Sequence, residues 1–193
     1  MFKEEISNEE VNSLPLIHFK GRIVVVDTEE AQEKAVEELQ RHEVLGFDTE
    51  TKPTFRKGQV RKVAILQLAT KEKAWLFRLF KTPVGDKLNE LLENEEIKKI
   101  GVAIDDDLKG LDDLRMFDPG GFIALEKKVK EVGILSNGLR KLSGIILNKR
   151  ISKGAQVSNW EAEELNEKQK IYAATDAWIC LRMWEELPEN IKF

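Results

Sequence analysis

The chain has 193 residues, of which 41% are hydrophobic and 34% charged, with a formal net charge of −4. This composition excludes an intrinsically disordered chain, and the length predicts a single domain over residues 1–193. One cysteine and two histidines exclude a disulfide framework and a cysteine-only metal cluster, and they argue against a histidine-based zinc site.

Membrane and export signals are absent from the sequence pattern. No apolar run approaches the ~18–20 residues that a membrane-spanning helix needs. The opening residues, MFKEEISNEE, are acidic and polar, unlike those of a signal or transit peptide. Together with the single cysteine, these observations lead us to expect a reducing, cytoplasmic setting by default.

The first half of the chain contains most of the strand patterns. After a polar lead-in, it predicts a short strand, a helix and three further strands. The short connection between the last two strands suits a hairpin, so these two strands are expected to pair antiparallel. The predicted elements span Ile23–Val26, Thr28 to about Arg41, Val44–Phe47, Val63–Ala69 and Ala74–Leu79.

The second half of the chain is mainly helical, with one further strand over Ile97–Ile104. An antiparallel strand pair followed by βα alternation predicts an α/β fold, with a mixed β-sheet flanked by helices on both faces. No glycine-rich nucleotide-binding loop follows a strand. The predicted helices span Leu88–Leu92, Leu108–Leu114, Ala124–Val132, Leu139–Leu147 and Asn166–Leu187.

Two carboxylates, Asp48 and Glu50, follow the apolar strand sequence VLGF. Side chains two residues apart in a strand point to the same side, so these carboxylates repel each other unless a cation lies between them. A strand that surfaces into a turn is the alternative. The same triplet, DTE, begins at Asp27, but there it leads into a helix-forming run, and helix capping accounts for it.

Further carboxylates stand beside apolar segments in the second half. Asp105, Asp106 and Asp107 lie between a predicted strand and a helix, where acids are favourable for electrostatic reasons alone. Asp176 interrupts a nearly apolar helix face, and Tyr172 lies one turn earlier on the same side. A lone buried carboxylate is costly, so a partner or a metal ion is indicated; the alternative is a partly exposed helix with a simple Tyr–Asp contact.

Positive charge is concentrated in two windows without acidic residues, between Glu50 and Glu72 and between Glu131 and Glu161. A local basic surface on an acidic protein suits a nucleic-acid backbone, although basic loops also occur as plain solvated surface. The nucleic-acid contacts predicted from these windows are Arg56, Lys57, Arg61, Lys62, Arg140, Lys141, Lys149, Arg150 and Lys153.

Three ordered segments resemble the motifs of a known nuclease family. FDTET, the strand–DDDL junction and YAATDA are similar to the three exonuclease motifs of the DEDD superfamily of 3′–5′ exonucleases. The tyrosine four residues before the last aspartate matches the tyrosine subdivision (DEDDy). Within it the chain resembles the Werner-type exonuclease domain and, less closely, ribonuclease D. The resemblance spans roughly residues 22–187 and implies a ribonuclease H-like mixed sheet.

The resemblance implies a role for five residues. In the family, the first aspartate bridges two metal ions and the glutamate two positions later ligates one of them; here these are Asp48 and Glu50. Counting along the preceding strand places the second-motif aspartate at Asp107. The last aspartate is Asp176, and Tyr172 is the tyrosine that orients the attacking water.

Four carboxylates without histidine or cysteine favour hard cations such as Mg²⁺ or Mn²⁺. Two such ions can clamp a phosphodiester for in-line attack by water. We therefore expect a two-metal 3′–5′ exonuclease that releases nucleoside 5′-monophosphates from the 3′ end of DNA or RNA. Thr51, beside the first motif, and Trp160, in the SNW segment before the last motif, complete the predicted nucleic-acid contacts.

Two other functions are compatible with parts of the pattern. A non-catalytic nucleic-acid-binding module would keep the fold, but a degenerate copy is expected to lack at least one of the five site residues, and all five are present. A two-metal hydrolase of small nucleotides would keep the carboxylates, but a small substrate needs no extended basic track.

Overall fold

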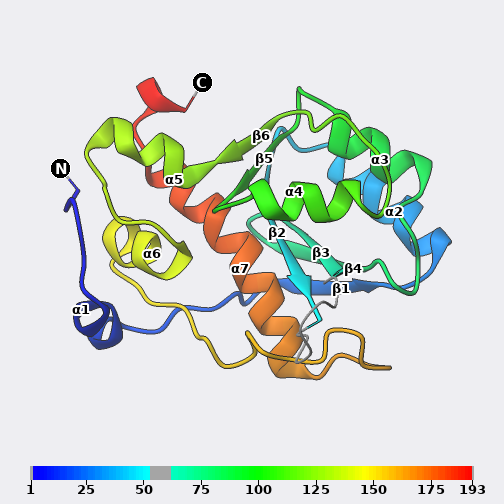
Figure 1. Cartoon of the computed structure of the whole chain (residues 1–193), viewed down its shortest axis with the longest axis horizontal. Helices are drawn as coiled ribbons and strands as arrows, with labels where there is room; N and C mark the ends of the chain where they lie inside the picture. The colour runs from blue at the N-terminus through cyan, green and yellow to red at the C-terminus, as the bar shows by residue number, and fades with distance from the viewer. Residues whose placement is uncertain (1, 53–61, 193) are drawn as a thin grey trace.

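The computed structural model describes residues 2–52 and 62–192 (Figure 1). Arg56, Lys57 and Arg61 of the first basic window, and most of the predicted loop that follows the first motif, lie outside the described residues. In the part of the chain that is described, no helix is long and apolar enough to cross a membrane.

The centre of the fold is a six-stranded mixed sheet with the strand order β1-β4-β3-β2-β5-β6. β3 pairs antiparallel with both β2 and β4, whereas the β1–β4, β2–β5 and β5–β6 pairs are parallel. The predicted hairpin is thus present, as β3 and β4. The strands are β1 (Arg22–Val26), β2 (Val44–Thr51), β3 (Val63–Ala69), β4 (Lys73–Arg78), β5 (Lys98–Gly101) and β6 (Phe122–Ala124).

Helices cover both faces of the sheet, which confirms the predicted α/β architecture (Figure 1). One face shares a core with α2 (Glu29–Leu39), α3 (Asp86–Glu93) and α4 (Asp105–Asp112). The other face packs mainly against α7 (Glu167–Glu186), with α5 (Leu125–Lys128) and α6 (Leu139–Leu147) beside it. All seven residues of β3 are buried, because helices lie over both sides of this strand.

The sequence predicted the start of the long helix α7 correctly, with Asn166 as its N-cap residue. Asn166 and Gln169 form a reciprocal capping box at its N-terminus, which satisfies two backbone N–H groups that no helical carbonyl reaches. Its small residues, Ala173, Ala174 and Ala177, are fully buried and allow the helix to lie close to the sheet.

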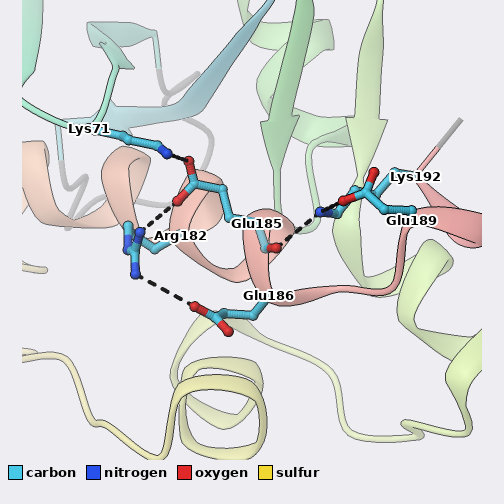
Figure 2. Close-up of polar contacts among 6 residues, drawn as sticks. All are labelled: Lys71, Arg182, Glu185, Glu186, Glu189 and Lys192. Atoms are coloured by element: carbon cyan, nitrogen blue, oxygen red, sulfur yellow. Dashed lines mark hydrogen bonds and ion pairs between the residues drawn. The ribbon is translucent and has the colours of Figure 1, made fainter.

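The C-terminal end of α7 is held by the polar contacts that Figure 2 shows. Lys71, in the β3–β4 turn, pairs with Glu185 (2.9 Å), which also pairs with Arg182 (2.6 Å). Lys192 donates a hydrogen bond to the Glu185 carbonyl (3.0 Å) and pairs with Glu189 (2.7 Å). The contact from Lys192 gives a partner to one of the carbonyls that the last helical turn leaves free, so this end of α7 is tied to the hairpin and to the chain that follows.

Two predicted elements differ from the structure. The strand predicted over Ile97–Ile104 ends at Gly101, because Ala103 has a left-handed backbone (φ 57°) that no strand continues through. The helix predicted over Ala124–Val132 is divided into α5 and the 3₁₀ helix η1 (Val129–Val132), and the short strand β6 precedes it.

The predicted polar lead-in forms an ordered segment, residues 2–19, that we call the N-terminal strap. It contains α1 (Asn8–Ser13), which begins with a capping box between Ser7 and Glu10. The Leu135 N–H donates to the Glu4 carbonyl (2.8 Å), the Arg150 guanidinium donates to the Leu14 carbonyl (2.9 Å), and the Phe19 N–H donates to the Thr175 hydroxyl (3.0 Å). The strap therefore runs along α6 and ends against the middle of α7.

Candidate active site

Strand β2 and helix α7 approach each other most closely at Gly46. A Cβ on this residue would lie 2.0 Å from the carbonyl oxygen of Ala177, so a glycine is required here. Gly46 lies two residues before Asp48 and therefore on the same strand face, and Ala177 directly follows Asp176. The contact between the two backbones brings both aspartates to one point.

The carboxylates of Asp48, Glu50 and Asp176 form a compact cluster there. One oxygen of each lies within 4.8 Å of the others. Asp176 is only 5% exposed, it is hydrogen-bonded to the Tyr172 hydroxyl, and its Oδ1 atom has no hydrogen-bond partner among the described residues. A buried carboxylate oxygen without a partner is unfavourable unless a cation binds it.

The electrostatics of the cluster favour a bound cation. Burial, and then repulsion from Asp176 and Glu50, hold the pKa of Asp48 well above its usual range. Burial followed by repulsion from Asp176 raises the pKa of Glu50 to about 9, and burial raises that of Asp176 to about 7, against the opposing hydrogen bond from Tyr172. The protein alone does not stabilise these charges together, and a divalent cation would.

Asp107 is held near the cluster by a hydrogen bond from Thr49. Thr49 lies between the two motif carboxylates in β2, so its side chain points to the opposite sheet face, where α4 packs. Its hydroxyl donates a hydrogen bond to the carboxylate of Asp107 in the first turn of α4. The charge of Asp107 raises the pKa values of Asp48 and Glu50, so it lies at the edge of the cluster although outside the compact group of three.

The two neighbouring aspartates of the triplet lie on the surface. Asp105 is exposed and pairs with Lys127 (3.0 Å), and Asp106 is exposed as well. Asp107 is the partly buried member of the triplet, and burial raises its pKa.

The burial of Trp160 contradicts one prediction. Its side chain is fully buried, with its ring centroid 6.0 Å from that of Tyr172 and an angle of 38° between the planes. The prediction that Trp160 contacts nucleic acid is wrong, because the indole has no exposed face on which a base can stack. Instead it supports the Tyr172 ring, and its N–H lies close enough to Glu50 to oppose the rise in that residue's pKa.

A cleft of about 480 Å³ opens over the cluster. Asp48, Glu50 and Asp176 line it together with Tyr172. Among the predicted basic contacts, the cleft is also lined by Arg140, Lys141 and Lys153. Because the first two lie in the first turn of α6, a basic wall stands in the same cleft as the carboxylates.

The other predicted contacts are not in this cleft. Arg150 uses its guanidinium to hold the strap at Leu14, and its neighbour Lys149 does not line the cleft. Thr51 is partly buried at the end of β2, and Lys62 is exposed; neither lines the cleft. The structure thus gathers part of the second basic window at the carboxylates.

Sequence reasoning missed Gly46 and Thr49, both within or beside the first motif. A glycine inside an apolar strand signals a close backbone approach, and this signal was available in VLGF. The role of Thr49 had no local signal, because its partner Asp107 is 58 residues away in the chain.

Comparison with known proteins agrees with this geometry. A family model described as 3′-5′ exonuclease matches residues 23–192. The chain is 34% identical over 192 residues to the bifunctional 3′-5′ exonuclease/ATP-dependent helicase WRN of Mus musculus. That alignment covers 91% of this chain and 13% of the mouse protein, so the chain corresponds to a small part of that relative.

Solved structures show the same fold. The EXO domain of Aedes aegypti Nibbler superposes with a TM-score of 0.78 at 21% identity, covering 89% of each chain. The Trypanosoma brucei RNase D complex with RNA U12 superposes with a TM-score of 0.77 at 21% identity, covering 89% of this chain and 64% of that one. The fold is therefore the expected ribonuclease H-like one, and the chain belongs to the 3′-5′ exonuclease domain family of the DEDD superfamily.

Proposed function

We propose that this chain is a metal-dependent 3′–5′ exonuclease of the tyrosine subdivision. It hydrolyses the last phosphodiester bond at the 3′ end of a nucleic acid and releases a nucleoside 5′-monophosphate. One observation carries the proposal: Asp48, Glu50 and Asp176 converge in a cleft that basic side chains also line, and one buried oxygen of Asp176 has no hydrogen-bond partner within residues 2–52 and 62–192.

The donor set fits hard divalent cations. All the candidate ligands are carboxylates, their pKa values are raised by burial and mutual repulsion, and Asp176 Oδ1 lacks a partner in the described part of the chain. Asp48, Glu50, Asp107 and Asp176 would hold two ions, Mg²⁺ or Mn²⁺. When bound, these ions supply activation of a water molecule and stabilisation of the departing oxygen.

Tyr172 positions the attacking water. Burial and the charges of Asp176 and Glu50 raise its pKa, so the phenol stays protonated and does not act as a base. Its O–H donates a hydrogen bond to the carboxylate of Asp176, so a lone pair of the phenol oxygen is free to accept a hydrogen bond from water. The buried ring of Trp160 fixes the direction of the phenol.

The basic wall of the cleft binds the phosphates upstream of the scissile bond. Arg140, Lys141 and Lys153 line the same cleft as the carboxylates and offset the negative charge that would otherwise repel the strand. The related RNase D of Trypanosoma brucei has been solved with RNA. For this chain the substrate class is nucleic acid, either RNA or DNA.

A direct digestion tests the proposed function. Matched DNA and RNA oligonucleotides labelled at the 5′ end should shorten one nucleotide at a time in Mg²⁺ or Mn²⁺, and the reaction should stop in EDTA because the carboxylates lose their cations. Gel analysis and mass spectrometry of the released products check this result. Undiminished cleavage in chelator, or release of 3′-phosphates, would contradict it.

The aspartate triplet at the start of α4 gives a second test. Asp107→Asn is expected to lower kcat/KM by about 10²-fold, because a charge at the edge of the metal cluster is lost. Asp105→Asn and Asp106→Asn serve as matched controls, since both side chains are exposed, and should stay within about twofold of wild type. Equal losses in all three variants would show that α4 is oriented differently.

A further inference from the structure

The turn between β5 and α4 lies at the edge of the carboxylate cleft and has an unfavourable backbone conformation. Val102 and Ala103 both line the cleft, and Ala103 has a φ of 57°. This left-handed conformation is costly for alanine, because its Cβ crowds the carbonyl oxygen that follows. Such a conformation persists where surrounding contacts hold it, so a contact that holds Ala103 is required.

Glu126, in the first turn of α5, provides that contact. Its Oε2 atom accepts a hydrogen bond from the Ala103 N–H at 2.9 Å, although the two residues are 23 positions apart in the chain. The distance is typical of a hydrogen bond from a backbone N–H to a carboxylate, which is stronger than one between neutral groups. The Glu126 side chain is partly buried where it makes this contact.

The pairing of β5 with β6 brings these two residues together. In this parallel pair Gly101 lies opposite Ala124, and both strands end at that level (Figure 1). Ala103 and Glu126 each follow two residues later, so both leave the sheet at the same edge. The buried side chain of Leu125 anchors α5 there. The short strand β6 therefore determines where the Glu126 carboxylate lies.

The position of Asp107 depends on the same turn. Asp107 is the third residue of α4 and follows Ala103 by four residues, and the helix begins with a hydrogen bond from the Leu108 N–H to the Ile104 carbonyl (2.9 Å). Ile104, the N-cap residue, has an apolar side chain that cannot cap the helix. The contact at Ala103 takes the place of a cap one residue earlier, and it sets the direction in which α4 leaves the turn.

The side chain of Asp107 has an anchor of its own. The Thr49 hydroxyl donates a hydrogen bond to Asp107 Oδ1 from the β2 side. Glu126 acts on the backbone of the turn and Thr49 on the carboxylate, so the two contacts fix different parts of the same segment. A ligand held at both places keeps one orientation before a cation binds.

We propose that Glu126 is a positioning residue, which fixes the start of α4 through the Ala103 N–H and so orients the Asp107 carboxylate towards the cluster. The proposal rests on the proposed function, in which Asp107 is a metal ligand, and it adds a residue to that function. Glu126 lies outside the compact group of three carboxylates. The role assigned to it is that of a hydrogen-bond acceptor and not that of a ligand.

Lys127, the next residue of α5, supplies a matched control. It also links α5 to the start of α4, through an ion pair with Asp105 (3.0 Å), but the two side chains are 60% and 75% exposed. Exposed ion pairs contribute little to stability. The two neighbours therefore differ in what they hold: Glu126 holds a backbone N–H in a strained turn, and Lys127 holds an exposed side chain.

The first test measures cleavage of an oligonucleotide labelled at the 5′ end. Glu126→Ala should lower kcat/KM about tenfold, mainly through kcat, because the residues that bind the strand are unchanged. Glu126→Gln should stay within about twofold of wild type, because its amide oxygen can accept the same hydrogen bond. Lys127→Ala should also stay within about twofold.

Two further measurements do not depend on turnover. In EDTA, backbone amides of residues 102–107 should exchange hydrogen about tenfold faster in Glu126→Ala than in wild type, because the Ala103 N–H has lost its acceptor. Calorimetric titration should show Mn²⁺ binding about tenfold weaker in the same variant. Glu126→Gln and Lys127→Ala should match wild type in both measurements.

A double-mutant cycle tests whether Glu126 acts through Asp107. In a protein that already carries Asp107→Asn, the additional change Glu126→Ala should lower kcat/KM by less than about twofold, because the ligand that it positions is already lost. A further loss of about tenfold would show that Glu126 affects the reaction by another route, and it would overturn the proposal.

The remaining outcomes separate this proposal from the function on which it rests. Glu126→Gln as impaired as Glu126→Ala would show that the charge is required, which overturns the role of acceptor. Equal hydrogen exchange and equal Mn²⁺ binding in Glu126→Ala and Lys127→Ala would overturn the proposal as well. Absence of metal-dependent cleavage by wild type would overturn the proposed function, whereas hydrogen exchange and Mn²⁺ binding would still decide whether Glu126 positions Asp107.

Discussion

Asp48→Asn is expected to lower kcat/KM on a single-stranded oligonucleotide by about 10³-fold or more, the largest loss among single side-chain changes in this chain. Asp48 lies at the centre of the carboxylate cluster, next to both Glu50 and Asp176. Under the proposed function, removing its charge would weaken the binding of cations that would contribute several kcal/mol to the stabilisation of the transition state. Single-turnover cleavage measures the effect on chemistry.

The same variant should be more stable than wild type when metal is absent. Burial and repulsion from the neighbouring carboxylates raise the pKa of Asp48, so an uncharged amide removes an unfavourable charge. Its melting temperature in EDTA should be a few degrees above that of wild type, which corresponds to a gain of about 1 kcal/mol in the free energy of unfolding. Addition of Mn²⁺ should no longer raise it further.

Asp27→Asn is the matched control, because Asp27 begins the other DTE triplet. Asp27 is exposed, and the following helix α2 is capped by Thr28, whose hydroxyl accepts a hydrogen bond from the Ala31 N–H (3.2 Å). Neither activity nor the response to Mn²⁺ should change. An inactive Asp27→Asn protein together with an active Asp48→Asn protein would show that the catalytic motif is the triplet that begins at Asp27 and not the one that begins at Asp48.

Gly46→Ala is expected to destabilise the protein by about 3 kcal/mol, at the upper end of overpacking effects. The added Cβ would lie 2.0 Å from the Ala177 carbonyl oxygen, and this obstacle is backbone, which cannot rotate away as a side chain can. Strand β2 and helix α7 must therefore separate. Urea denaturation measures the loss of stability, and Mn²⁺ titration should show weaker binding, since the same separation moves Asp48 from Asp176.

Gly144→Ala provides the comparison for this prediction. In α6 the three atoms nearest to the added Cβ would be methyl carbons of Ile6, Val11 and Leu14, at 3.2–3.3 Å. The gain in helix propensity from glycine to alanine, about 1 kcal/mol, offsets this tight contact. A Gly46→Ala protein as stable and as Mn²⁺-responsive as Gly144→Ala would contradict the idea that backbone contact sets the position of the two aspartates.

The sequence pattern predicted correctly those features of the fold that lie within a single helix or strand. The apolar run of β2 and the helical spacing of Tyr172 and Asp176 each fit within one element, so the sequence placed these side chains on the correct faces. Strand β6 was missed because three residues are too few to show a period of two, and its pairing with β5 decides that it is a strand.

Contacts between segments that are far apart in the chain could not be predicted from the sequence. The hydrogen bond from Thr49 to Asp107 and the burial of Trp160 both depend on how α4 and the segment before α7 fold against β2. The strap shows no more than a polar lead-in in its sequence, because its hydrogen bonds are made with residues near Leu135 and Arg150, far along the chain. Residue type alone carries no information about such partners.

The attachment of the strap has a consequence for how enzymes of this kind can diversify. Backbone carbonyls at Glu4 and Leu14 hold it in place together with the buried side chains of Ile6, Val11 and Phe19, whereas most of its other side chains are exposed. Its exposed positions can therefore change in sequence while β2 and α7 keep the carboxylates. The exposed surface beside the site and the carboxylate cluster itself are then free to change independently of each other in evolution.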